Sequence, residues 1–443
     1  MTYNSQPARL LRPLLCLALL LTVGAQAFAQ GPTPTEQRIA AYVDHYLEDA
    51  IDLLERTTNI NSGTMNFEGV RAVGRVFQAG LDSLGFLSHL VDQTGVDRAG
   101  HLVAFRAGGS SKTVLLIGHL DTVFEQDSPF QEFHRLGSHA TGPGTEDMKG
   151  GDVVIVYALK ALQAAGVLDS LNIYVVMTGD EEDPGEPVDS ARVHLVAAAR
   201  QSNYALGFEA GIGTGTATIA RRGFTGWTLK VKGTPWHSSQ IFRGPVGSGS
   251  IYEAARILHR FHEELGEEYL TFNPGMIVGG TTITYDLMQS RGTAFGKTNV
   301  VAESTLVAGD LRFISNEQRE RAKERMRGIV SRHLPRTSAE ITFQDSYPAM
   351  APNDGNLALL AKLDRVSRDL SYGPVEAVDP SRRGAADVAF ASSLVQGSLD
   401  GLGIVGEGGH TVDESVDLSS LSTMIKRAAI LIYRLAREGE DGE

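Results

Sequence analysis

Cysteine is nearly absent from this chain, whose 443 residues contain a single one, Cys16. Because Cys16 falls in an apolar stretch near the N-terminus, the rest of the chain can form no disulfide and offers no thiolate as nucleophile or metal ligand. A metal bound by the rest of the chain must therefore be held by histidine nitrogens and carboxylate oxygens.

The sequence also lacks any concentration of positive charge. Its 40 Lys and Arg residues against 53 Asp and Glu give a formal charge of −13, and no basic run interrupts this balance. The charge argues against nucleic acid or an anionic membrane as partner. The apolar fraction of 42% is ordinary for a globular enzyme, and the length exceeds what one hydrophobic core usually supports. We therefore expect two domains.

One long apolar run is present, at residues 14–23, where Arg9 and Arg12 precede it and an Ala-x-Ala site ending at Ala29 follows. A run of this length between positive charges and small residues is typical of a signal peptide and is short for a membrane anchor, which is the alternative. We expect residues 1–29 to be removed. The protein would then be periplasmic or secreted, without stable membrane association.

Alternating strand and helix patterns occupy both ends of the remaining chain. They are helices at 37–55 and 70–84, a strand at 113–117, a helix after 150, a strand at 171–177, and helices at 358–369 and 421–437. This alternation predicts a three-layer α/β/α domain with a largely parallel sheet.

The pattern changes in the middle of the chain. Residues 224–232 alternate apolar and polar side chains, which is typical of a sheet with one wet face. Helices at 251–265 and 317–333 and strands at 276–285, 304–313 and 339–343 follow. This order predicts an inserted α+β domain of the split β-α-β, ferredoxin-like kind. We divide the chain into 30–222 and 343–443, which form the α/β domain, and 223–342, the inserted domain.

His119 and Asp121 follow the strand at 113–117, in the motif Gly-His-Leu-Asp-Thr-Val. Side chains two apart in a strand point the same way, and α/β proteins bind ligands beyond the carboxyl ends of their strands. Asp121 can therefore bind a metal beside His119 or accept its second N–H and orient it.

Further candidate ligands lie at strand ends or in glycine-rich turns. They are Asp147, Glu181, Glu182, Glu209 and His410. A helix N-cap is an equal alternative for Asp147, and a solvated acidic turn is the alternative for Glu181 and Glu182. Histidines and carboxylates without cysteine suit a hydrolytic zinc site, in which two metals about 3.5 Å apart share a carboxylate and another carboxylate acts as base.

Taken in this order, the motifs resemble those of the co-catalytic zinc amidohydrolases. That family includes carboxypeptidase G, aminoacylase, acetylornithine deacetylase and succinyl-diaminopimelate desuccinylase. The resemblance implies two Zn²⁺ per chain, with Co²⁺ or Mn²⁺ as substitutes. It assigns His119 and Glu209 to one zinc and Glu182 and His410 to the other, with Asp147 as the bridge.

The resemblance also implies the roles of residues that do not bind metal. Asp121 would orient His119, and Glu181 would be the general base that activates the metal-bridging water. The peptide bond after Asp147 is often cis in this family. The inserted domain would form a homodimer and carry His237 into the partner's site to stabilise the oxyanion, although Trp236 departs from the family's small neighbours. A surface histidine is the alternative for His237.

Four further residues are candidates for binding substrate. Asn299 and Arg312 match family positions that touch the substrate carbonyl and carboxylate, and Arg382 and Arg383 lie in a glycine-containing segment near the family's active site. A surface arginine paired with an acid is the alternative for Arg312. An arginine fork suits a carboxylate.

The sequence thus predicts an exported dizinc hydrolase of amide bonds in peptides or N-acyl amino acids. Its residues do not separate a carboxypeptidase from an aminoacylase or an aminopeptidase. The alternative is a catalytically inactive periplasmic protein of the same fold that binds metal or peptide. That alternative has no need of Glu181, a carboxylate beside the ligands that would bind no metal.

Overall fold

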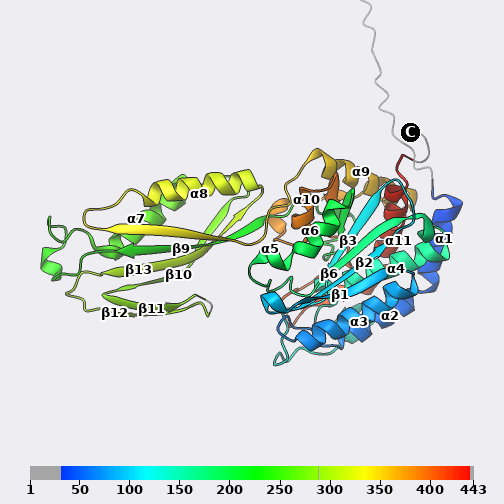
Figure 1. Ribbon diagram of the computed structural model, residues 1–443, viewed down its shortest axis with the longest axis horizontal. Coiled ribbons are helices and arrows are strands. Elements are labelled where there is room, and N and C mark those ends of the chain that lie inside the picture. The colour runs from blue at the N-terminus through cyan, green and yellow to red at the C-terminus, as the bar shows by residue number, and fades with distance from the viewer. Residues whose placement is uncertain (1–30, 288, 440–443) are drawn as a thin grey trace, which may run out of the picture.

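The computed structural model describes residues 31–287 and 289–439, so the expected signal peptide lies outside the described residues. Among those residues, no helix combines the length and apolarity that crossing a membrane requires. Figure 1 shows two lobes joined by a narrow connection. The larger lobe contains both ends of the described chain, and the smaller lobe is built from its middle.

A six-stranded sheet forms the centre of the larger lobe, in the order β1–β2–β6–β3–β7–β16. The strands are β1 (Leu87–Gln93), β2 (Arg98–Arg106), β6 (Asn172–Thr178), β3 (Thr113–His119), β7 (Tyr204–Gly207) and β16 (Gly397–Leu399). The pairs from β6 to β16 are parallel, whereas β1 and β2 form an antiparallel edge. The sequence pattern does not predict this edge, because β1 mixes polar and apolar residues without a regular alternation.

Alternate residues of β3 enter two different cores. Leu116 packs with α4 (Gly150–Ala164) and α11 (Leu418–Ala436), whereas Leu115 packs with α6 (Val193–Arg200) and α10 (Val388–Ser392). The separation arises because residues 114–117 form a continuous apolar run, and successive side chains of a strand point to opposite faces of the sheet. The predicted three-layer α/β/α class is confirmed.

Helix α4 is buried along almost its whole length between the sheet and its neighbours. The remaining helices of this lobe are α1 (Pro34–His45), α2 (Leu47–Thr58), α3 (Phe67–Ser83), α5 (Val188–Ala191) and α9 (Asp354–Asp369). The single helix predicted at 37–55 is wrong, because the backbone leaves helical geometry at Tyr46, with φ −108° and ψ 24°.

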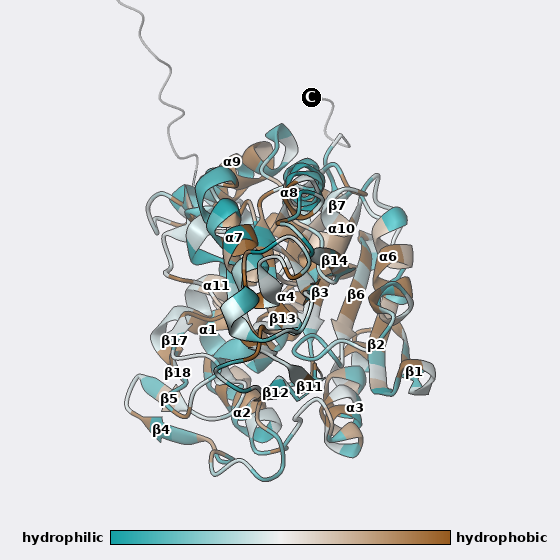
Figure 2. Cartoon of the chain, turned by 90° about the vertical axis from the view of Figure 1, so that its left-hand side faces the viewer, coloured by the Kyte–Doolittle hydropathy of each residue, from teal (hydrophilic) through white to brown (hydrophobic). Residues whose placement is uncertain are grey.

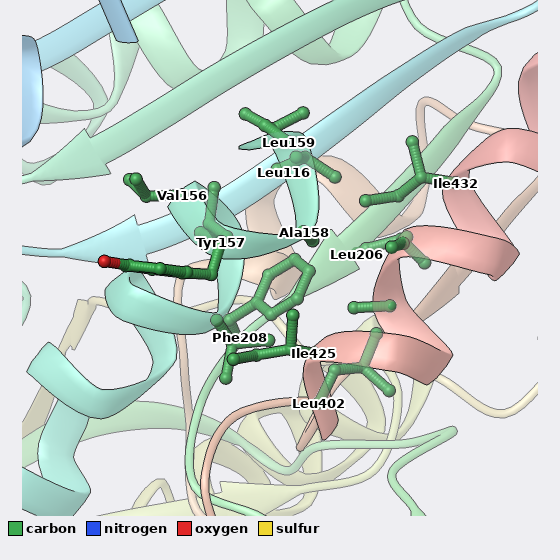
Figure 3. Packing of buried hydrophobic residues seen from close by; sticks show 14 of the residues in the cluster. Leu116, Val156, Tyr157, Ala158, Leu159, Leu206, Phe208, Leu402, Ile425 and Ile432 are labelled. Atoms are coloured by element: carbon green, nitrogen blue, oxygen red, sulfur yellow. The ribbon is translucent and has the colours of Figure 1, made fainter. Parts of the chain in front are cut away.

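The core around α4 and α11 makes a stability prediction. Ile425 is fully buried and lies near Phe208 and Leu402 in Figure 3. We expect Ile425→Val to lower the free energy of unfolding by about 1 kcal/mol, because it removes one buried methylene and leaves a small cavity. Urea unfolding followed by circular dichroism measures this loss. Ile251→Val, at a 49% exposed position, is the control and should change little.

The smaller lobe has a four-stranded antiparallel sheet in the order β10–β13–β9–β14. Its elements are β9 (Gly223–Lys232), α7 (Gly249–Glu264), β10 (Thr271–Gly280), β13 (Ser304–Phe313), α8 (Asn316–Val330) and β14 (Ser338–Asp345). This is the predicted ferredoxin-like order, with both helices packed on one face. Figure 2, in which this lobe faces the viewer, shows α8 as predominantly hydrophilic on the outside.

The strand predicted at 276–285 is wrong beyond Gly280. There β10 ends, and β11 (Thr282–Asp286) pairs with β12 (Arg291–Phe295) as a separate hairpin. Residues typical of strands continue on both sides of Gly279 and Gly280, so the sequence pattern does not reveal the change of partner. The short strands β4 (His134–Leu136), β5 (His139–Thr141), β8 (Thr216–Ala217), β15 (Glu376–Ala377), β17 (Gly406–Glu407) and β18 (Ser415–Asp417) complete the described strands.

Candidate metal centre

Three parallel strands of the large sheet bring acidic residues and a histidine to one edge. His119 is the last residue of β3, Glu181 and Glu182 follow β6, and Glu209 follows β7. Because the carboxyl ends of parallel strands meet at the same edge, residues far apart in the sequence lie together here.

Asp147 lies between the two histidines. Its Oδ1 is 3.1 Å from Nε2 of His119, and its Oδ2 is 3.1 Å from Nε2 of His410. On the first side, Glu209 Oε1 lies 3.8 Å from His119 Nε2, and on the second, Glu182 Oε2 lies 3.1 Å from His410 Nε2. The structure therefore forms two triads that share one carboxylate.

Each triad has the composition of a metal site. In each, one ligand atom per residue can be chosen so that all lie within 4.8 Å of one another. Glu182 Oε1 is buried without a hydrogen-bond partner among the described residues, so it has acceptor capacity left for a ligand. Two imidazoles and three carboxylates fit a pair of divalent cations.

The turn that carries Asp147 is fixed by a buried carboxylate. Asp147 lies in a single turn, Thr145–Lys149, directly before α4, and its peptide bond to Met148 is cis, as the family resemblance implies. Glu414 accepts the backbone N–H groups of Glu146 at 2.8 Å and of Asp147 at 3.3 Å. These contacts position the shared carboxylate between the histidines.

Asp121 organises both sides of the strand edge and is fully buried. His119 Nδ1 lies 3.1 Å from the carbonyl oxygen of Asp121 and 3.4 Å from its carboxylate. The carboxylate accepts the backbone N–H groups of Glu181 at 3.0 Å and Glu182 at 3.1 Å, together with the Thr64 hydroxyl at 2.7 Å. Asp121 thus contacts the imidazole and the acidic pair at once, a geometry suited to orienting them.

The crowded carboxylates perturb one another. Burial and then the charge of Asp147 raise the pKa of Glu182 to about 7 and that of Glu209 to about 8. Burial and the Glu209 charge raise the pKa of Glu181 well above its usual range. Hydrogen bonds to Asp147 and Glu182 raise the pKa of His410 to about 11. This accumulation of buried negative charge favours a cationic ligand.

A second layer of charge beneath the site has no signal in the sequence motifs. The fully buried Arg192 donates from Nη1 to Asp180 Oδ1 at 2.6 Å and from Nε to Asp387 Oδ1 at 2.7 Å. Arg221 forms a similar buried pair with Asp400. Asp180 and Asp387 lie close in sequence to the candidates Glu181 and Arg383, but only the fold shows that Arg192 pairs with both.

The inserted domain brings two of its predicted residues together. The Ser238 backbone N–H donates to the Asn299 carbonyl at 2.9 Å, which brings the segment of His237 next to Asn299. His237 is exposed, and its Nδ1 lies 2.9 Å from Ser239 Oγ. Neither residue belongs to the two triads of this chain.

Arg312 faces a groove of about 960 Å³ on the open side of the smaller sheet. Its guanidinium lies 4.5 Å from the centre of the Phe224 ring, and Nε donates to Asp310 Oδ2 at 3.0 Å. Pairing with an acid was the alternative considered for Arg312, and this contact is present.

The two arginines predicted at 382 and 383 differ in position. Arg383 donates from Nη2 to the Ala210 carbonyl at 3.0 Å, next to Glu209. Burial and the nearby charge of Arg221 lower the pKa of Arg383 to about 10. Arg382 is exposed at the end of a short turn. Of the pair, the structure brings Arg383 toward the carboxylates.

Comparison with known proteins agrees with this arrangement. Residues 115–434 match the model of peptidase family M20/M25/M40. The chain is 25% identical over 433 residues to carboxypeptidase G2 from Pseudomonas sp. (strain RS-16), a match that covers 96% of this chain and 99% of that protein.

Solved structures show the same fold. An aminopeptidase PepT from Bacillus cereus superposes with a TM-score of 0.70 at 17% identity, covering 88% of this chain and 99% of that one. A dinuclear metal-binding peptidase from Bacillus subtilis superposes with a TM-score of 0.62 at 15% identity, covering 88% and 98%.

Proposed function

Because the chain belongs to peptidase family M20/M25/M40, we propose that it is a dizinc hydrolase of amide bonds in peptides or N-acyl amino acids. The observation that carries this proposal is the Asp147 carboxylate, whose two oxygens lie 3.1 Å from Nε2 of His119 and of His410. A shared carboxylate between two His–Glu pairs is the arrangement that a co-catalytic metal pair requires.

The residues of each triad would hold one zinc. His119 and Glu209 would bind the first and Glu182 and His410 the second, and Asp147 would contribute to both. When bound, the metals polarise the scissile carbonyl and lower the pKa of a water. Proton transfer and substrate binding are carried out by side chains of the protein.

Glu181 is the proposed general base. Its backbone N–H is tied to Asp121, and burial together with the neighbouring Glu209 charge keeps its pKa raised. A carboxylate with a raised pKa takes a proton from the attacking water and returns it to the leaving nitrogen more readily than an exposed one. Asp121 keeps His119 and Glu181 in position through these steps.

The inserted domain supplies the proposed substrate contacts. Arg312 binds a substrate carboxylate and Asn299 its carbonyl, and Arg383, which belongs to the larger lobe, is a second anion contact. His237 stabilises the oxyanion in the site of a second copy of the chain, so we propose a homodimer through this domain. The signal peptide would place the enzyme in the periplasm or outside the cell.

Metal analysis combined with a substrate panel tests the function. We expect two zinc ions per chain and turnover within a panel of N-acyl amino acids and dipeptides. Asp147→Ala should lose both metals, because it removes the shared ligand, whereas Asp413→Ala, an exposed residue of the His410 loop, should keep them. A protein that binds no zinc, or an Asp147→Ala variant that retains two, would contradict the ligand assignment.

A further inference from the structure

Two segments of chain connect the lobes, and they pair with each other. The outgoing segment carries Arg221 into β9, and the returning segment leaves β14 and carries Tyr347 toward α9. The Phe224 N–H donates to the Tyr347 carbonyl at 2.9 Å, and Arg221 and Met350 exchange two backbone hydrogen bonds of 2.9 and 3.0 Å. The connection is therefore a two-stranded ribbon, and its two strands must move together.

Tyr347, on the returning strand, contacts the loop of Glu181. Its hydroxyl donates to the Glu181 carbonyl at 2.7 Å and accepts from Arg192 Nη2 at 2.8 Å. Arg192 is fixed to the larger lobe by Asp180 and Asp387. The Tyr347 hydroxyl has one hydrogen to donate, and the Glu181 carbonyl accepts it. A displacement of the ribbon would therefore shift the backbone of the proposed base.

Arg221, on the outgoing strand, approaches Glu209. Its Nη2 lies 3.9 Å from Glu209 Oε2 and is buried without a hydrogen-bond partner among the described residues. Asp400 pairs with Arg221 and also accepts the Glu209 backbone N–H at 3.3 Å. The other oxygen of Glu209, Oε1, faces His119. The carboxylate of Glu209 thus has one oxygen near His119, at the proposed metal position, and the other near Arg221, on the ribbon.

We infer that Tyr347 and Arg221 are positioning residues that couple the orientation of the inserted domain to the proposed base Glu181 and the proposed ligand Glu209. This inference rests on the function proposed above. Each strand of the ribbon carries one of the two residues, and each reaches a different carboxylate of the site. Movement of the smaller lobe about the ribbon therefore changes both carboxylates together.

The coupling must act in both directions. If the position of the inserted domain changes the affinity of the site for zinc, then zinc binding changes the equilibrium between positions of the inserted domain. The coupling free energy is the same in both directions. The buried contacts of Tyr347 and Arg221 can transmit such a change, because packed interiors switch between discrete arrangements and do not deform gradually. Zinc binding is therefore expected to change the distance between the lobes.

Kinetics test the contact to Glu181. Tyr347→Phe removes one hydroxyl and keeps the ring packed against Phe390. We expect kcat to fall about 10-fold with KM nearly unchanged, since small misplacements of a catalytic group can cost up to about 100-fold. The control is Tyr204→Phe, which removes a hydroxyl paired with Glu438 at the opposite end of β7 and should leave kcat unchanged.

An inter-lobe distance tests the coupling without using activity. Spin labels at Gln163→Cys on α4 and Glu324→Cys on α8, in a chain with Cys16→Ser, report the separation of the lobes. We expect zinc to shift the distance distribution, and we expect the shift to disappear when Tyr347→Phe and Arg221→Lys are combined. Zinc bound by each protein is measured in parallel by calorimetry.

The outcomes separate this inference from the proposed function. Zinc binding with turnover, but an equal distance shift in the double variant, would overturn the coupling and leave the function standing. The coupling would also be overturned if zinc did not change the distance between the two labels in the protein that keeps Tyr347 and Arg221. A chain that binds no zinc at all would remove both proposals.

Discussion

Replacing Glu181 by Gln is expected to lower kcat of amide hydrolysis by about 10²- to 10⁴-fold, the usual contribution of a positioned acid or base. Glutamine has nearly the same shape and keeps the backbone contact to Asp121, but it cannot accept a proton. Glu181 belongs to neither triad, so zinc content should stay that of the unmodified protein. Single-turnover kinetics and metal analysis on the same preparation measure both quantities.

The adjacent residue provides the matched control. Glu182→Gln changes the same functional group one position along the chain, but Glu182 Oε2 lies 3.1 Å from His410 and belongs to the second triad. This variant should lose zinc affinity as well as turnover. If Glu181→Gln lost zinc, or if it hydrolysed substrate at the original rate, the assignment of base and ligand to the two neighbours would be wrong.

Replacing Arg192 by Met is expected to lower the free energy of unfolding by about 3–5 kcal/mol, because it leaves the buried carboxylates of Asp180 and Asp387 without their cation. Both ion pairs are buried, at 2.6 and 2.7 Å. Methionine keeps much of the volume, so lost packing contributes little. Urea unfolding followed by circular dichroism measures the change.

An exposed ion pair is the control for Arg192. Arg135 pairs with Glu48 at 2.7 Å, but the two side chains are 41% and 68% exposed. Because solvent screens such pairs, Arg135→Met should cost at most about 1 kcal/mol. Equal effects of the two substitutions would mean that the buried network around Arg192 carries no special share of the stability.

Short-range patterns account for what the sequence could predict. His119 and Asp121 lie two residues apart at the end of one apolar strand, and Glu181 and Glu182 directly follow another, so the topology of a parallel sheet was enough to bring them together. The residues that support them could not be found in this way. Arg192 and Asp387 are 195 positions apart, and Arg221 and Asp400 are 179 apart. No periodicity links such pairs before the chain folds.

The pairing partners of some strands and one break between helices could not be predicted from the sequence either. Strand-forming residues run from β10 into β11 without a clear break, and β1 has no clear alternation, so the partners of these strands depend on tertiary packing. The break at Tyr46 likewise falls inside a continuous apolar stripe, which read as one helix. Elements with strong periodicity, such as β3 and α11, were predicted to within a few residues.

The inserted domain leaves and rejoins the larger lobe at adjacent points. Thr225 near the start of β9 lies opposite Asp345 at the end of β14 in the sheet register. A unit whose two ends lie side by side can be inserted into a host fold without separating the parts of the host, as is common for domain insertions. We therefore expect a turn that joins Thr225 to Asp345 to replace the rest of the insertion and to leave Arg221 and Tyr347 in place on the larger lobe.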